Sequence, residues 1–157
     1  MTLLHGILSG IALLSVAVIY GTDVFSALVQ RPAMARVDDE VLTATMGFIH
    51  LYGDKRLSVP GVIGVVATAL TTGAAAFTGN TVALVAGAVA LVLLIVWLVI
   101  YGRISAPVNK KLTAAAVAGV TATGARQLQL TWDSVINVRV LLQGLALCAL
   151  FLGAAIR

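Results

Sequence analysis

Long apolar runs, separated by short polar stretches, are the main pattern along the chain. Between Leu57 and Gly102 no Asp, Glu, Lys or Arg interrupts the sequence. A helix needs about 20 apolar residues to cross the roughly 30 Å hydrocarbon core of a bilayer. This run is therefore long enough for two membrane-spanning helices, and the apolar runs on either side of it supply one more each.

Turn and breaker residues set the limits of the predicted spanning helices. Pro32 is expected to end the first, because proline removes a helical hydrogen bond, and Pro107 is expected to end the third. Pro60 suits the first turn of the second helix, and "TGN" at residues 78–80 is the turn after it. The predicted fold is an all-α, integral membrane four-helix bundle in one domain, residues 1–157, with helices at residues 3–29, 60–77, 81–101 and 134–156.

Two shorter amphipathic helices are predicted in the connections. Acidic side chains stabilise the N-terminal end of a helix, so Asp39 and Glu40 predict a helix over residues 39–56. Its apolar positions recur at helical spacing: Leu42, Met46, Ile49 and Gly53. The second amphipathic helix is expected within the Ala-rich residues 109–133, leading into the fourth spanning helix.

Small and aromatic residues indicate how the spanning helices pack. The second helix has one small residue at every fourth position: Gly64, Thr68, Thr72 and Ala76. In lipid such a strip lets helix backbones approach closely, so it is expected to contact another helix or, in a homo-oligomer, a second copy of the chain. Trp97 and Tyr101 end the third helix and are predicted to anchor it at the membrane interface.

The composition agrees with insertion into a lipid bilayer. The chain is 61% hydrophobic and 10% charged, whereas soluble domains are about 45–50% apolar and about 25% charged. A net charge of +4 does not indicate nucleic-acid binding, because the basic residues stand in short connections without a recognition motif. The single cysteine, Cys148, excludes an internal disulfide. No basic stretch precedes the first apolar run, which favours a retained helix over a signal peptide.

The distribution of Lys and Arg predicts the orientation in the cell membrane. Basic residues near the ends of spanning helices are enriched on the cytoplasmic side. The turn between the second and third helices has none, whereas the two long connections share Arg31, Arg36, Lys55, Arg56, Arg103, Lys110, Lys111 and Arg126. Both long connections are therefore predicted to be cytoplasmic, with both termini outside.

Polar side chains from distant parts of the chain are predicted to lie at one depth, near the cytoplasmic side. At ~1.5 Å per residue, Asp23 lies about 30 Å along the first helix. Ionisable groups cost about 2.5–3.5 kcal/mol within a spanning helix and usually face a cavity or one another. We therefore expect a pocket in the cytoplasmic half of the bundle, with candidate residues Asp23, His50, Asp54, Asn109, Trp132, Asn137, Arg139 and Gln143 and with Asp133 at the same level.

Arg139 is the most unusual of these residues. It stands seven positions after Trp132, nearly two helical turns, and Gln143 extends the same face. It could line a substrate pocket as a cation, or it could extend to the interface or pair with Asp23. In the last case Asp23 would join the first helix to the fourth; otherwise Asp23 could be a buried base.

His50 and Asp54 stand four residues apart and share a helix face. An aspartate can orient an imidazole, either as a general base or as a metal ligand; the alternative is an interfacial histidine beside a surface carboxylate. The only other histidine, His5, is expected at the opposite side of the bilayer. That placement argues against a bis-histidine haem and leaves open a one-histidine haem or a metal at His50.

Few local motifs narrow the chemistry further. Asn109 in "APVN" either caps the following helix or contributes to the pocket. No phosphate-binding loop, nucleophile elbow or pair of cysteine ligands is present in the sequence.

Several stretches together resemble a family of small four-helix membrane proteins that includes the anthrone oxygenases. These stretches are "YGTDVFSALVQRPAM", "APVNKKL" and "LQLTWDSVINVRVLLQGLAL". Within them the resemblance rests on Pro32, on Pro107 with Asn109, and on Trp132 with Arg139. It covers nearly the whole chain, and "HxYGD", His50 to Asp54, is similar to members from actinobacteria.

The resemblance implies a four-helix membrane bundle and, from its characterised members, oxidation of an anthrone-type aromatic compound to a quinone by molecular oxygen. We therefore predict an oxygenase in which His50, oriented by Asp54, removes a proton from a phenol or from an activated carbon of the substrate. Arg139, with Asn109 or Trp132, would hold the resulting anion. A carbanion can react with oxygen directly, so no cofactor is strictly required. The alternative is a non-catalytic membrane subunit or a component that binds or transports a small molecule.

Overall fold

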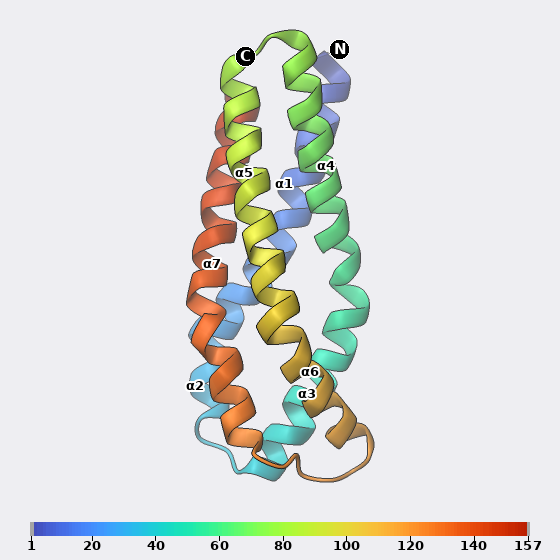
Figure 1. Cartoon of the computed structure of the whole chain (residues 1–157), viewed down its shortest axis with the longest axis vertical. Helices are drawn as coiled ribbons and strands as arrows, with labels where there is room; N and C mark the ends of the chain where they lie inside the picture. Colours follow the sequence, from blue (N-terminus) through green and yellow to red (C-terminus); the bar gives the residue numbers. More distant parts are fainter. Residues whose placement is uncertain (1, 157) are drawn as a thin grey trace. The chain divides into compact units, whose positions relative to one another are not determined.

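Helices make up nearly all of residues 2–156, the part of the chain that the computed structural model describes, and no strand occurs there (Figure 1). The predicted all-α class is therefore confirmed. The elements are α1 Thr2–Phe25, the π-helical turn η1 Ser26–Gln30, α2 Arg31–Met34, α3 Asp39–Arg56, α4 Ser58–Thr78, α5 Thr81–Ile100, the π-helical turn η2 Tyr101–Ser105, α6 Ala106–Val117 and α7 Ala125–Ala155.

Within residues 2–156, four helical segments are long and apolar enough to cross a membrane. Length and composition identify them: each contains an 18-residue window with mean hydropathy of 1.6 to 3.0. The segments are Leu3–Met34, Ser58–Thr78, Thr81–Val117 and Ala125–Ala155. All four are longer than the helices predicted from the sequence, at 3–29, 60–77, 81–101 and 134–156.

The two prolines that were expected to end helices do not end them. Helical structure continues through Pro32 to Met34 and through Pro107 to Val117. In each case a π-helical turn directly precedes the short helix whose first turn contains the proline. A π turn pairs each N–H with the carbonyl five residues back, as Arg31 N–H does with Ser26 O. The wider turn accommodates a residue that has no N–H and whose ring crowds the preceding turn.

The second connection also differs from the prediction. Residues 106–117 form α6, which continues directly from η2, and no separate amphipathic helix leads into α7. The chain reverses between α6 and α7 through Gly119 and Gly124, whose φ angles are +68° and +66°. Residues with a side chain rarely adopt such angles, which is why glycine occupies both turn positions. α7 then starts at Ala125, immediately after Gly124.

By its internal contacts the chain divides into two compact units. Unit 1 comprises the described residues of Met1–Gly21, Val59–Trp97 and Leu141–Arg157. Its apolar core contains Ala12, Val16, Ala67, Ala90, Leu94, Ala146 and Leu150. The turn between α4 and α5 lies beside the end of α7 (Figure 1), where Asn80 Nδ2 donates to Ile156 O at 3.4 Å.

Small residues allow close helix contacts within unit 1. A Cβ added to Gly64 would lie 3.0 Å from Val16 Cγ2, and one added to Gly87 would collide with Thr72. The small-residue strip of α4 thus contacts α1 and α5 of the same chain, although its last member, Ala76, is exposed. Trp97 is only 7% exposed; it packs inside unit 1 instead of lying at the surface as an interfacial anchor would.

Unit 2 comprises Thr22–Ser58 and Leu98–Val140. Its helices α3 and α6 pack against each other, and a Cβ on Gly47 of α3 would collide with Leu112 and Ala116 of α6. The predicted apolar face of α3 is partly wrong, because Ile49 is exposed. The buried face is rotated from it and consists of Leu42, Thr43, Met46, Gly47 and His50.

Candidate functional site

A buried ion pair joins Asp23 of α1 to Arg139 of α7 within unit 2. Arg139 Nη2 donates to Asp23 Oδ1 at 2.8 Å, and Arg139 Nε donates to Asp23 Oδ2 at 3.1 Å. The two residues are only 3% and 5% exposed. Two parallel hydrogen bonds between guanidinium and carboxylate give the pair both strength and a fixed orientation. Of the alternatives that the sequence left open for Asp23 and Arg139, the structure therefore shows the ion pair between them.

The two π turns bring further polar side chains to this region. Ser105 of η2 accepts a hydrogen bond from Arg139 Nη1 at 2.7 Å. In η1, Ser26 donates to Gln30 Oε1 at 2.8 Å, and Gln30 Nε2 in turn contacts Met46 Sδ at 3.3 Å. Because a π turn changes the direction in which the following side chains project, these residues face the interior of unit 2.

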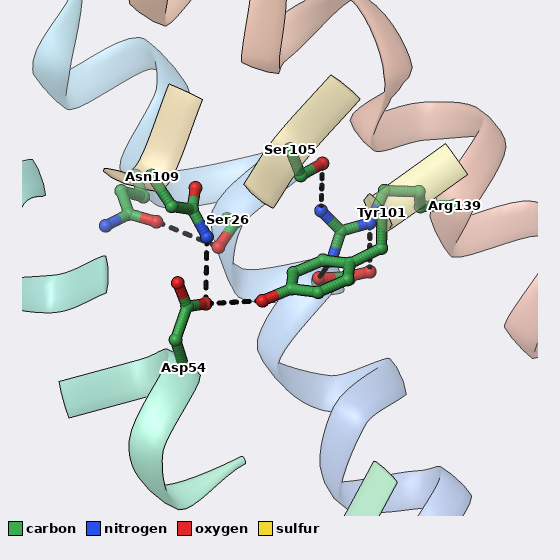
Figure 2. Close-up of polar contacts among 8 residues, drawn as sticks. Ser26, Asp54, Tyr101, Ser105, Asn109 and Arg139 are labelled. Atoms are coloured by element: carbon green, nitrogen blue, oxygen red, sulfur yellow. Dashed lines mark hydrogen bonds and ion pairs between the residues drawn. The ribbon is translucent and has the colours of Figure 1, made fainter. Parts of the chain in front are cut away.

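Two aromatic rings flank the Arg139 guanidinium. Its central carbon lies 5.4 Å from the Trp132 ring and 5.7 Å from the Tyr101 ring. A cation at this distance over a ring is attracted by the negative face of the π system. Figure 2 shows the Tyr101 ring between the Arg139 guanidinium and the Asp54 carboxylate. Tyr101 was predicted to be an interfacial anchor, and the structure places it in this polar network instead.

Asp54 is held by Tyr101 and Asn109. Its Oδ1 atom accepts from the Tyr101 hydroxyl at 2.8 Å and from Asn109 Nδ2 at 2.9 Å (Figure 2). Asn109 lies inside α6 and does not cap it. Among the described residues no hydrogen bond joins Asp54 to His50. The expected orientation of the imidazole by Asp54 is therefore absent, because Asp54 faces η2 and α6.

His50 lies inside unit 2 against Trp132. The side chain is 5% exposed, and the centroids of the two rings are 5.6 Å apart with an interplanar angle of 42°. Burial lowers the pKa of His50 to about 4; the Asp54 carboxylate acts in the opposite direction and the Arg139 guanidinium in the same one. The imidazole is consequently neutral at pH 7.

Three buried polar atoms near this network have no hydrogen-bond partner among the residues that the structure describes. They are His50 Nε2, Trp132 Nε1 and Asn109 Oδ1. Buried polar groups are normally paired, because leaving one unpaired costs about 1–3 kcal/mol. One acceptor oxygen, one indole N–H and one imidazole nitrogen are therefore available to a ligand or to water.

Two of the predicted pocket residues do not join the network. Asn137 is exposed, and its Oδ1 accepts from Arg31 Nη1 at 3.4 Å. Gln143 belongs to unit 1. There, with Trp97 and Ile19, it lines a cavity of about 10 Å³, roughly the size needed for one water molecule. Asp133 accepts from Gln129 Nε2 at 2.9 Å, one turn away on the same helix.

The residues present do not fit a metal ion held by several protein ligands. Within residues 2–156 no three His, Cys, Asp or Glu side chains come together in a way that could hold one. His50 contributes a single imidazole, and the nearby Asp54 already accepts two hydrogen bonds through one oxygen.

Four residues of the network were not among the candidates from the sequence. They are Ser26, Gln30, Tyr101 and Ser105, and all of them belong to the π turns. The one indication in the sequence was a proline shortly after each group, and local rules interpret such a proline as a helix end and not as the residue that follows a π turn.

A comparison of the chain with known protein families, with characterised proteins and with solved structures finds no match.

Proposed function

We propose that the chain is an integral membrane oxidoreductase that binds a lipophilic, anthrone-type aromatic molecule beside His50 and oxidises it with molecular oxygen. The observation that carries the proposal is the state of His50. Its imidazole is buried and neutral, it contacts Trp132, and its Nε2 has no partner among the described residues. A neutral imidazole nitrogen inside a protein is available to accept a proton from a bound molecule.

Membrane insertion and its direction are part of the proposal. Four long apolar helices support insertion. The basic residues of α3, η2 and α6 support a cytoplasmic position for the connections that carry His50 and Asn109. A lipophilic substrate could then reach the site from the bilayer, and the site would lie in the cytoplasmic half of the protein.

The reaction can be written with the residues of unit 2. The enol tautomer of the anthrone carries a hydroxyl, and His50 takes the proton of that hydroxyl, which leaves the anion that is delocalised onto the former CH₂ carbon. That carbanion passes electrons to O₂, a carbon–oxygen bond forms, and the resulting peroxide anion takes the proton back from the His50 imidazolium to give a hydroperoxide. Loss of water from the hydroperoxide yields the quinone carbonyl, so anthrone and O₂ give anthraquinone and H₂O. The substrate is oxidised by two electron pairs, and O₂ is reduced to the new carbonyl oxygen and water.

The electrostatic role of Arg139 in this scheme is indirect. Its charge is balanced by Asp23, so it helps to fix the Trp132 ring more than it attracts an anion. The enolate oxygen would instead accept from Trp132 Nε1, while the imidazolium formed on His50 supplies the opposite charge. The anion that develops beside His50 stabilises the imidazolium as the proton is transferred.

Oxygen uptake by purified protein in detergent tests this proposal. With anthrone as the probe, we expect oxygen consumption and anthraquinone formation by the wild-type chain. His50→Ala should lower the rate by at least about 100-fold, the usual contribution of a general base. His5→Ala is the matched control, because it removes the other histidine, and should leave the rate unchanged. No turnover by the wild-type protein would overturn the oxidoreductase proposal.

One observation favours a second candidate, a membrane component that binds a small molecule without transforming it. Arg139 directs Nε, Nη1 and Nη2 at Asp23 and Ser105, so the cation expected to stabilise an anionic intermediate is already engaged. Saturable binding of anthrone without oxygen uptake would support this candidate against the first.

A further inference from the structure

We infer that the site selects a ligand oxygen that carries a hydrogen, a phenolic or enolic hydroxyl, held between Trp132 Nε1 and His50 Nε2. This inference deepens the proposed function, because it names the chemical group that the same site recognises. It also applies if the protein binds its ligand without oxidising it.

The position of the two unpaired nitrogens is the first support. Both side chains are more than nine-tenths buried, at 5% exposed for His50 and 6% for Trp132. Their ring centroids are 5.6 Å apart. The two rings are therefore neighbours, and this separation is compatible with one oxygen atom that forms a hydrogen bond of about 2.9 Å to a nitrogen on each ring.

The chemistry of the two nitrogens is the second support. An indole N–H only donates, so the ligand atom facing Trp132 must be an acceptor. The neutral form of His50 has one ring nitrogen that accepts, and with Nε2 as that nitrogen the ligand atom must also donate. A hydroxyl oxygen does both at once. An ether or a ketone oxygen satisfies Trp132 alone.

The surroundings disfavour a carboxylate in the same place. A carboxylate has no hydrogen to offer to Nε2 and would need a counter-charge after leaving water. The nearest cation, Arg139, is already paired with Asp23 through two hydrogen bonds. A neutral hydroxyl brings no such cost, and it becomes an anion only after His50 has taken its proton.

A matched pair of probes tests the inference: 2-naphthol, which has a hydroxyl, and its methyl ether, 2-methoxynaphthalene, which cannot donate. Dissociation constants are measured by titration calorimetry of the full chain in detergent. The dissociation constant of the ether divided by that of 2-naphthol measures the preference for the hydroxyl. This ratio should be about fivefold larger in the wild-type protein than in His50→Ala. Comparing the two proteins cancels the different partitioning of the probes into detergent. Equal ratios in the two proteins would overturn the inference.

A second measurement does not depend on the folding of a His50 variant. The chain has two tryptophans, Trp97 and Trp132, so two indole N–H signals are expected in a ¹⁵N NMR spectrum, and Trp132→Phe assigns them. Addition of 2-naphthol should move the Trp132 signal and leave that of Trp97 in place. If only the Trp97 signal moves, or neither does, the inference is wrong.

The outcomes separate this inference from the proposed function. Anthrone oxidation without discrimination between the two naphthalene probes would leave the oxidoreductase proposal standing and would overturn the hydroxyl recognition. Discrimination between the probes without oxygen uptake would overturn the oxidoreductase proposal and would leave the hydroxyl recognition standing.

Discussion

Arg139 and Asp23 stand 116 positions apart and meet through two hydrogen bonds of 2.8 and 3.1 Å inside unit 2. The pair joins the last turn of α1 to the first half of α7. Arg139 also contacts Ser105, Tyr101 and Trp132. A buried pair of this kind does little for net stability compared with apolar residues. It makes the loss of either partner costly, because a lone charge then remains buried.

Removal of one member of the Asp23–Arg139 pair should therefore destabilise the protein strongly. Arg139→Ala or Asp23→Ala should each lower the free energy of unfolding by about 3–5 kcal/mol, and the double variant should lose less than the sum. Thermal unfolding in detergent, followed by circular dichroism, measures this. Arg31→Ala is the control, because Arg31 makes a long, exposed contact with Asn137. Additive effects of the two single changes would contradict a coupled pair.

Exchange of the same two residues tests what the pair does beyond stability. If Asp23 and Arg139 serve only to join α1 to α7, Asp23→Arg combined with Arg139→Asp should recover much of the thermal stability and the ligand binding. If the direction of the guanidinium toward Trp132 matters, stability should return without binding. Binding of 2-naphthol to the exchanged variant distinguishes the two results.

The buried His50 should make stability depend on pH in a defined direction. The pKa of His50 is about 4 in the folded protein and 6.5 when unperturbed. Between these values the unfolded chain binds a proton that the folded chain does not, so stability falls as the pH is lowered from 6.5 toward 4. The full loss is on the order of 3 kcal/mol. His50→Gln should remove this part of the pH dependence, and parallel wild-type and variant profiles of unfolding temperature against pH would contradict the prediction.

The hydroxyl of Tyr101 should contribute more to the free energy of unfolding than the hydroxyl of Tyr52, an exposed tyrosine on α3. Tyr101→Phe keeps the ring beside Arg139 and removes the hydrogen bond to Asp54. We expect a loss of about 1.5–3 kcal/mol, the range for hydrogen bonds to charged groups, toward the lower end because Asp54 is exposed. Tyr52→Phe is the matched control, since Tyr52 is 53% exposed and should change stability by less than about 0.5 kcal/mol. Chemical unfolding of both variants gives the comparison.

Gly47 should be intolerant of any side chain. A Cβ at this position would collide with the backbone of Leu112 and with Ala116, so Gly47→Ala should push α3 away from α6 and cost about 1–3 kcal/mol. Gly73 of α4 provides the contrast, because an added Cβ there meets nothing within 4 Å. Gly73→Ala should be neutral or stabilising by up to about 1 kcal/mol, as expected for a helix interior. Equal unfolding temperatures for the two variants would contradict a close contact between α3 and α6 at Gly47.

The sequence alone determined the helical fold and the four long apolar segments, because hydrophobic run length and the scarcity of charge are local properties. It also indicated that Asp23, His50 and Arg139 belong to one region, since burying an ionisable group requires a reason. Only the tertiary structure decided their partners. Asp54 bonds to Tyr101 and Asn109, away from His50. Partner choice depends on how distant helices pack, and no spacing along one helix contains that information.

The π turns show the same difference between what the sequence determines and what the tertiary structure determines. Pro32 and Pro107 are visible in the sequence, and local rules place a helix end at each. Packing instead retains the helix through a wider turn, which changes the direction of every later side chain. Tyr101 and Ser105 thereby face Asp54 and Arg139, a result that follows from the fold and from no residue pattern.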